Sequence, residues 1–298
     1  MGDDPNRPHR PVLVQEVLAA MAVRPGGLYV DGTIGGGGHA RALLAASAPD
    51  GRLVGIDWDP AALDRARRNL AGLEDRVFLH QANYGDVEEI LGRGRVGRVQ
   101  GVLLDLGASL EQLTSPERGF SIQADGPLDM RYSPGNPVTA MEIVNHRPQR
   151  VLEEIFRRYG EERWAGRIAR AIVRSRPLAT SQELARLVVA VVPGKRGRIH
   201  PATRVFQALR IEVNQELGNL EHGIRGGAAC LERAGRLCVI SYHSLEDGLV
   251  KRLFREMVAS TGKGIFRILT PKPIRPGAAE IRENPSARSA KLRILERM

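Results

Sequence analysis

Three aspartates, Asp31, Asp57 and Asp105, each follow a short apolar segment of the kind that forms a buried strand. The carboxyl ends of parallel strands meet at one edge of a sheet, where open α/β folds bind their ligands. We therefore expect the three carboxylates to lie close together at that edge. There they can accept hydrogen bonds from a ligand, although Asp57 and Asp105 have capping of a following helix as the alternative role.

A glycine-rich loop follows the first of these acids, with four consecutive glycines at residues 35–38 between an expected strand and an expected helix. Glycine is needed where the backbone takes positive φ or touches a ligand without an intervening Cβ. Such loops serve nicotinamide dehydrogenases and methyltransferases alike, and Asp57 fits ribose binding in either class. The run is not a clean G-x-G-x-x-G and Asp31 directly precedes it, which favours a methyltransferase over a dehydrogenase.

The elements that position these residues alternate between strand and helix in the first third of the chain. Strands are predicted at 28–31, 53–57, 77–81 and 99–105, with helices beginning near His39, Pro60 and Asp86. This alternation predicts a parallel sheet of the α/β class. A further strand is expected at 236–241 and a helix from Leu245, and two β-like pieces at 264–269 and 290–295 predict a closing antiparallel hairpin.

A helical insertion interrupts this pattern after Gly107. Helical segments are predicted at 148–159, 162–175 and 181–191, followed by one long amphipathic helix at 201–220. The predicted organisation is a first part of an α/β domain at 1–112, an inserted all-helical domain at 113–205, and the second part of the α/β domain at 206–298.

The charge of the chain is concentrated in that insertion. The net charge is +10 over 298 residues, and the segment from Arg147 to Arg210 holds 15 basic and 5 acidic residues, so it accounts for the whole surplus. A polyanionic partner such as RNA is therefore expected, with an ordinary solvated helix face as the alternative. Cys230 and Cys238 form no metal-ligand pattern, and no apolar stretch suits a membrane span. The expected location is the cytoplasm.

Nine motifs in order along nearly the whole chain resemble the bacterial ribosomal RNA cytidine N4-methyltransferase family. They are HRPVL at 9–13, DGTIGGGGH at 31–39, LLDLG at 103–107, ERGFS at 117–121, DGPLDMR at 125–131, YGEER at 159–163, HPATRVFQA at 200–208, SYHSLED at 241–247 and ENPSARS at 283–289. The resemblance implies a class I, Rossmann-like, S-adenosylmethionine-dependent methyltransferase domain with an inserted helical domain that faces RNA. The implied substrate is a cytidine in the decoding centre of small-subunit (16S) ribosomal RNA, within the small ribosomal subunit.

The resemblance also implies a set of S-adenosylmethionine-binding residues, namely Gly37, Gly38, His39, Asp57, Tyr84, Asp105 and Gln112. Three places depart from the family pattern. The family's Ser-Ser-Pro-Gln stretch is replaced by residues 108–112, which lack one serine and the proline, and this puts the placement of Gln112 in question. Tyr84 and Tyr242 both stand where phenylalanine is common. A homodimer is left open, because nothing in the sequence specifies the oligomeric state.

The exocyclic amine of cytosine is a poor nucleophile because its lone pair is conjugated with the ring. An enzyme must therefore offer acceptors for the amine protons while it holds an unpaired or flipped base. The candidates for this catalytic role are Asp105, Ser109 and His243, with a backbone carbonyl as the main acceptor, or a purely structural His243, as alternatives.

The residues expected to contact RNA are Arg118, Arg131, His200 and Arg204, and Asp129 is expected to anchor one of these arginines. No metal site is expected, because the seven histidines form no ligand cluster in the sequence. Two other functions are left open. A nicotinamide-dependent oxidoreductase explains the glycine loop but not the basic insertion. A non-catalytic ribosome-assembly factor explains the insertion but not the loop.

Overall fold

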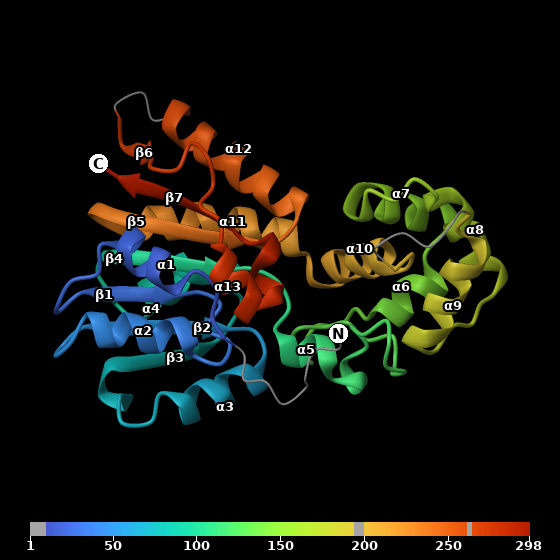
Figure 1. Cartoon of the computed structure of the whole chain (residues 1–298), viewed down its shortest axis with the longest axis horizontal. Coiled ribbons are helices and arrows are strands. Elements are labelled where there is room, and N and C mark those ends of the chain that lie inside the picture. Colours follow the sequence, from blue (N-terminus) through green and yellow to red (C-terminus); the bar gives the residue numbers. More distant parts are fainter. Residues whose placement is uncertain (1–9, 194–199, 261–263) are drawn as a thin grey trace. The chain divides into compact units, whose positions relative to one another are not determined.

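The computed structural model describes residues 10–193, 200–260 and 264–298. These residues form two compact units. An α/β unit contains residues 8–107 and 217–298, and a helical unit contains residues 108–216. The chain therefore leaves the α/β unit once, builds the helical unit, and returns (Figure 1).

The α/β unit is built on a seven-stranded sheet in the order β3-β2-β1-β4-β5-β7-β6. The strands are β1 (Leu28–Asp31), β2 (Arg52–Asp57), β3 (Val77–Gln81), β4 (Val99–Asp105), β5 (Leu231–Ser241), β6 (Phe266–Ile268) and β7 (Lys291–Arg297). The five strands from β3 to β5 are parallel, whereas β7 is antiparallel to both β5 and β6. The parallel sheet and the closing antiparallel pair predicted from the sequence are confirmed.

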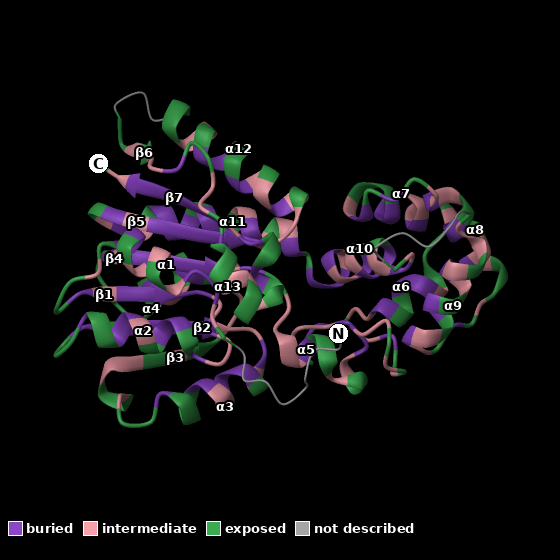
Figure 2. Cartoon of the chain, in the orientation of Figure 1, coloured by how far each residue is buried: buried purple, intermediate pink, exposed green. Residues whose placement is uncertain are grey.

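Helices cover both faces of this sheet. The first face packs α1 (Val14–Met21), α2 (Gly38–Ala46) and α3 (Pro60–Asn69), and the second face packs α4 (Val87–Arg93), α11 (Glu216–Cys230) and α12 (Ser244–Ser260). β4 shows why two layers are needed, since Leu103 faces the first core and Leu104 faces the second. A central parallel strand that is apolar on both faces is stable only when both are covered. Figure 2 shows these central strands as buried.

The helical unit has its own apolar core. Its helices are α5 (Leu110–Thr114), α6 (Ala140–His146), α7 (Gln149–Gly160), α8 (Ala165–Arg174), α9 (Ser181–Val191) and α10 (Thr203–Asn214). Fully buried side chains from five of them, including Phe156, Ile168, Leu184 and Leu209, meet in one cluster. The helices from α6 to α10 each present an apolar stripe to that core and polar residues elsewhere, as amphipathic helices do.

The prediction of one helix at 201–220 is wrong, because two helices occupy this stretch. Gln215 takes a left-handed conformation (φ 48°) between α10 and α11. α10 packs on α7 within the helical core, and the Asn214 side chain bonds to the Met130 carbonyl and accepts from the Tyr132 N–H. The helical unit therefore runs to Glu216, whereas the sequence placed its end at 205.

Several short elements did not appear in the sequence prediction. They are α1, α5, α6, α13 (Ala278–Glu283) and the 3₁₀ turns Glu74–Arg76, Tyr84–Asp86, Pro116–Arg118 and Pro285–Ser289. Within the described ranges, no helix has both the length and the apolar character needed to cross a membrane.

Candidate cofactor site

The register of the sheet brings the three strand-end aspartates to the same edge. Asp31 pairs with Gly55 of β2 on one side and with Leu103 of β4 on the other. Asp57 and Asp105 each lie two residues beyond those partners, so they flank the loop that leaves β1. The proximity expected from the sequence therefore follows directly from the parallel register.

The glycine loop turns sharply from β1 into α2. Gly35 and Gly37 have positive φ values of 51° and 82°, which strain other residues. A Cβ on Gly38 would lie 2.9 Å from Cγ of Pro11, so this position also lacks room for a side chain. A Cβ on Gly35 or Gly36 would meet little, since the nearest atoms lie 3.8 Å and 3.7 Å away. The loop is thus tight on the helix side and open at its tip.

Asp57 holds the open tip of the loop from β2. Its Oδ2 accepts the Gly35 N–H at 2.9 Å and its Oδ1 accepts the Asp59 N–H at 2.9 Å. Burial raises the pKa of Asp57 from 3.8 to about 6, an effect opposed by these hydrogen bonds and by the charge of Arg65. Each carboxylate oxygen has a second lone pair, so Asp57 can still accept hydrogen bonds from ribose hydroxyls. The helix-capping alternative is wrong, because Asp59 caps α3.

Asp31 and His39 are buried side by side beneath the loop. Asp31 is 1% exposed, and burial raises its pKa from 3.8 to about 7. Burial also lowers the pKa of His39, so its ring is neutral at pH 7. The Nε2 atom lies 2.9 Å from the Val12 carbonyl, which can only accept, so the proton sits on Nε2 and Nδ1 carries a lone pair. Nδ1 lies 3.7 Å from Oδ2 of Asp105, but the neutral ring forms no ion pair there.

Asp105 is fixed at the end of β4 by its backbone and its carboxylate. Its N–H donates to Thr33 Oγ1 at 2.7 Å, which ties β4 to the glycine loop. Its Oδ1 accepts the hydroxyl of Tyr242 at 2.8 Å. Tyr242 follows β5, is partly buried, and was not among the predicted site residues. Two sequence signals could have indicated it, namely its position directly after a parallel strand and its place in the SYHSLED motif where phenylalanine is common.

Tyr84 lies past β3, as expected, in the turn Tyr84–Asp86. A Cβ added to Gly32 would lie 3.2 Å from the Cβ of Tyr84. A Cβ added to Gly223 of α11 would lie 2.6 Å from Cδ2 of the Tyr84 ring, so the edge of this ring lies against Gly223. The ring is therefore packed on a helix beside the first residue of the glycine loop. This arrangement places an aromatic side chain on the same edge as Asp31 and Asp57.

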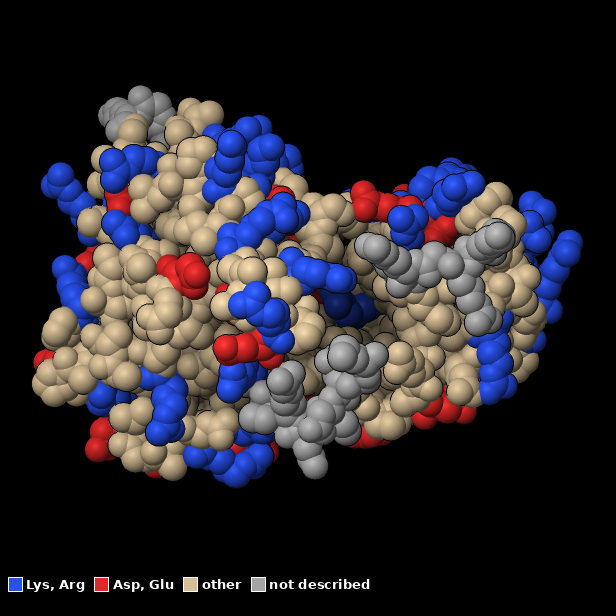
Figure 3. Space-filling model, in the orientation of Figure 1, with Lys and Arg blue, Asp and Glu red and all other residues tan. Residues whose placement is uncertain are grey.

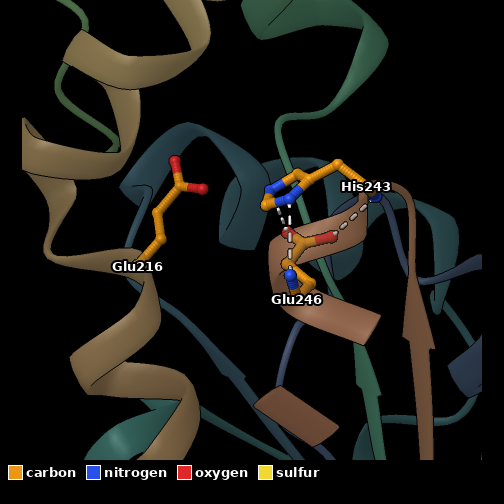
Figure 4. Close-up of side chains that lie close together, drawn as sticks. All are labelled: Glu216, His243 and Glu246. Atoms are coloured by element: carbon orange, nitrogen blue, oxygen red, sulfur yellow. Dashed lines mark hydrogen bonds and ion pairs between the residues drawn. The ribbon is translucent and has the colours of Figure 1, made fainter. Parts of the chain in front are cut away.

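His243 directly precedes α12 and is engaged with Glu246 (Figure 4). Its Nδ1 accepts the Glu246 N–H at 3.4 Å, while Glu246 Oε2 accepts the N–H groups of Tyr242 and His243 at 2.8 and 3.3 Å. This reciprocal arrangement is that of a capping box. The Nε2 atom of His243 lies 3.1 Å from Oε1 of Glu246. The structural alternative for His243 therefore has direct geometric support.

Glu216, which is also drawn in Figure 4, belongs to the helical unit, where it pairs with Arg210 and accepts the Tyr132 hydroxyl.

Ser109 and Gln112 belong to the helical unit and form a capping box on α5. The Ser109 hydroxyl accepts the Gln112 N–H at 3.2 Å, and the Gln112 side chain accepts the Ser109 N–H at 2.9 Å. Both predicted site residues thus have a local structural role. Their predicted roles toward donor and base stay predictions.

Two of the four arginine and histidine residues expected to contact RNA have structural roles in the helical unit. Arg131 forms a two-pronged pair with Asp129 and donates to the carbonyls of Pro134 and Asn136. Asp129 thus anchors an arginine, as expected. Arg118 donates to the carbonyls of Arg131 and Tyr132. His200 and Arg204 are exposed, although His200 Nδ1 accepts the Ala202 N–H at 3.2 Å and Arg204 donates to the Glu161 carbonyl at 3.3 Å.

Other arginines of the helical unit are exposed to solvent (Figure 3). Arg167, Arg170 and Arg174 have helical spacing and lie on α8, opposite the buried residues Ile168, Ala169 and Ile172. They form one stripe of positive charge, because residues three and four apart share a helix face. We refer to these three residues as the α8 arginine stripe. The sequence predicted the charge of this unit but not this particular face.

The strand order, the antiparallel seventh strand, the glycine loop and the strand-end carboxylates together define a class I methyltransferase domain. The family model for the MraW methylase family matches residues 6–298. The chain belongs to this family.

Curated relatives match along the whole chain. The ribosomal RNA small subunit methyltransferase H of Syntrophobacter fumaroxidans is 46% identical over 314 residues, covering 100% of this chain and 98% of that protein. The protein of the same name from Syntrophotalea carbinolica is 48% identical over 307 residues, covering 97% and 98%. The resemblance noted in the sequence is thereby confirmed, and the dehydrogenase alternative is wrong.

Proposed function

We propose that this chain transfers the methyl group of S-adenosylmethionine to ribosomal RNA of the small subunit. The observation that carries the proposal is the set of three strand-end aspartates around an open glycine loop in a member of the MraW methylase family. The relatives' names, which specify a small-subunit ribosomal RNA methyltransferase, supply the substrate class.

The residues at the sheet edge suit S-adenosylmethionine in their chemistry. Asp57 would accept the ribose hydroxyls, since each of its oxygens retains a lone pair. Gly37, Gly38 and His39 begin α2, whose first-turn N–H groups suit the carboxylate of the methionine moiety. Asp31 would hold its amino group, and Tyr84 the adenine. Gln112 completes the set by family resemblance alone. The cofactor supplies an activated methyl group on a sulfonium.

The proposed acceptor is the exocyclic N4 amine of a cytidine in the decoding centre. This amine needs hydrogen-bond acceptors for its protons as it attacks, and Asp105, Ser109 and His243 are the candidates. Asp105 offers an oriented carboxylate beside the donor-binding residues. His243 is engaged as the cap of α12 and Ser109 as the cap of α5, so both hold local structure as well. We therefore assign the leading catalytic role to Asp105.

The helical unit would bind the RNA through exposed arginines. Phosphate contacts need accessible guanidinium groups, which Arg204 and the α8 arginine stripe provide. His200 is exposed, lies four residues before Arg204 and suits a stacked base. Arg118 and Arg131 would contribute to RNA binding indirectly, by holding the loop at residues 131–136 through bonds to its carbonyls. A cytoplasmic location and a homodimer are further hypotheses, and sedimentation of the purified chain tests the second.

The test is transfer of radiolabel from S-adenosylmethionine to small ribosomal subunits that lack the modification, followed by nucleoside analysis. We expect label in N4-methylated cytidine, and its loss in Asp57→Ala. The matched control is Asp64→Ala, which removes an exposed carboxylate from the neighbouring helix α3. Free ribosomal RNA as a second substrate distinguishes the assembled subunit from naked RNA.

Absence of transfer to either substrate by the wild-type chain, together with absence of S-adenosylmethionine binding, would refute the proposal. Binding of RNA regardless of the methyl donor would then support the assembly-factor alternative. Label in a different nucleoside would retain the methyltransferase and overturn the N4-cytidine assignment.

A further inference from the structure

Tyr242 occupies a fixed position between β5 and α12. Its backbone N–H donates to Glu246 Oε2 at 2.8 Å, so the residue is tied to the first turn of α12. Its ring packs against the apolar core on the first face of the sheet. A Cβ on Gly107 would lie 3.8 Å from Cδ2 of the ring, so the side chain lies along the segment that leaves β4. A phenylalanine could fill the same space.

The hydroxyl group makes a hydrogen bond that phenylalanine could not make. It donates to Oδ1 of Asp105 at 2.8 Å, across 137 residues of sequence. Hydrogen bonds to a charged acceptor are about twice as strong as those between neutral groups. Burial and the Asp105 carboxylate raise the pKa of Tyr242 well above 10, so the hydroxyl keeps its proton throughout the physiological range.

The consequence is an oriented carboxylate at the end of β4. The terminal torsion of an aspartate is broad when nothing restrains it. In this chain the Asp105 N–H is bonded to Thr33, Oδ1 is bonded to Tyr242, and Oδ2 consequently faces His39 at 3.7 Å. Thr33 and His39 belong to the glycine loop and the start of α2. The Tyr242 hydroxyl therefore sets which way Asp105 presents its charge to the cofactor-binding loop.

We propose that Tyr242 is a positioning residue for the methyl donor, which it helps to bind by fixing the plane of the Asp105 carboxylate. This inference rests on the proposed function, because it treats Asp105 and His39 as donor-binding residues. Tyr242 itself does not need to touch the donor. The Tyr242 hydroxyl orients the Asp105 carboxylate before the donor binds, so this carboxylate loses less orientational freedom on binding.

The central experiment measures the dissociation constant of S-adenosylmethionine by calorimetry for the wild-type chain and for Tyr242→Phe. We expect up to about 10-fold weaker binding in the variant, because the Asp105 carboxylate must then be ordered when the donor binds. The KM of Tyr242→Phe for the RNA substrate should change by less than about 2-fold, because Tyr242 is not among the residues proposed to contact RNA.

A matched control separates positioning from general loss of stability. Tyr29 is a fully buried tyrosine of β1 whose hydroxyl accepts the N–H of Arg24, at the opposite end of the strand from Asp31. Tyr29→Phe removes the same atom from the same unit. We expect it to lower the thermal midpoint and to leave the dissociation constant of S-adenosylmethionine unchanged.

A double-mutant cycle with Asp105→Asn tests whether Tyr242 acts through Asp105. The amide removes the charge and keeps the shape, so Tyr242→Phe should weaken binding much less in the Asn background than in the wild-type background. Equal effects in both backgrounds, or unchanged affinity in Tyr242→Phe, would overturn the inference while leaving the proposed function intact. Failure of the wild-type chain to bind S-adenosylmethionine would overturn both.

Discussion

The two units of this protein place charge in opposite ways. The α/β unit gathers three aspartates at one edge of its sheet, where burial raises the pKa of Asp31 and Asp57. The helical unit leaves many of its arginines in solvent, among them the α8 arginine stripe. Buried carboxylates suit a small ligand with hydroxyl and amino groups, whereas exposed guanidinium groups suit a polyanion. We therefore expect separate sets of residues to determine donor affinity and RNA affinity.

The largest expected effect tests the buried acids. Asp31→Asn keeps the shape and an acceptor for the Thr33 N–H but removes the charge expected to hold the donor's amino group. We expect about 100-fold weaker binding of S-adenosylmethionine, because a buried charged hydrogen bond is lost. Calorimetry with the purified variant measures this loss, and unchanged affinity would remove Asp31 from the site.

The same substitution should stabilise the chain without ligand. The pKa of Asp31 is raised to about 7 in the folded state, so wild-type stability falls as pH rises from about 4 to about 7. Asparagine does not titrate, so the variant should gain stability over this range. At pH 8 we expect a gain of about 1 kcal/mol or more, seen as a thermal midpoint roughly 2–4 °C higher. The difference should vanish near pH 4.

A smaller effect is expected from the α8 arginine stripe. Replacing Arg167, Arg170 and Arg174 with glutamine should raise the KM for RNA about 10- to 30-fold. It should also lower the slope of log affinity against log salt by about 0.7 for each phosphate that is no longer neutralised. Donor affinity should be unchanged. The control replaces Arg93, Arg225 and Arg252, which removes three exposed charges from the α/β unit. Equal losses in both triple variants would show that net charge, rather than this stripe, binds RNA.

The smallest effect distinguishes a structural arginine from an exposed one. Arg131→Met breaks the pair with Asp129 and the bonds to two carbonyls, so we expect a loss of about 1–2 kcal/mol in unfolding free energy. Arg204→Met should leave stability unchanged and raise the KM for RNA. Denaturant unfolding and steady-state kinetics of both variants check this. Equal stability of the two would contradict the assignment of Arg131 as structural.

The features that could be predicted from sequence are local. The glycine loop and the acids at strand ends depend on neighbouring residues and on the parallel register, so Asp31, Asp57 and Asp105 were placed correctly at one edge. The α12 cap could also have been found, because His243 and Glu246 have the three-residue spacing of a capping box.

The features that could not be predicted depend on distant parts of the chain. The break at Gln215 lies within a pattern that reads as one continuous helix, and it accompanies contacts with distant residues, namely the packing of α10 on α7 and the bonds of Asn214 to Met130 and Tyr132. Tyr242 and Asp105 are 137 residues apart, so nothing local couples them. The role of Arg131 follows from loop carbonyls whose positions the sequence does not reveal.

The most direct test of the separation between the two units is a steady-state measurement of both KM values in two variants, Asp31→Asn and the triple α8 arginine variant. We predict that Asp31→Asn raises the KM for S-adenosylmethionine and leaves that for RNA unchanged, and that the arginine variant does the reverse. A variant of either kind that raises both KM values equally would contradict the separation of donor binding from RNA binding.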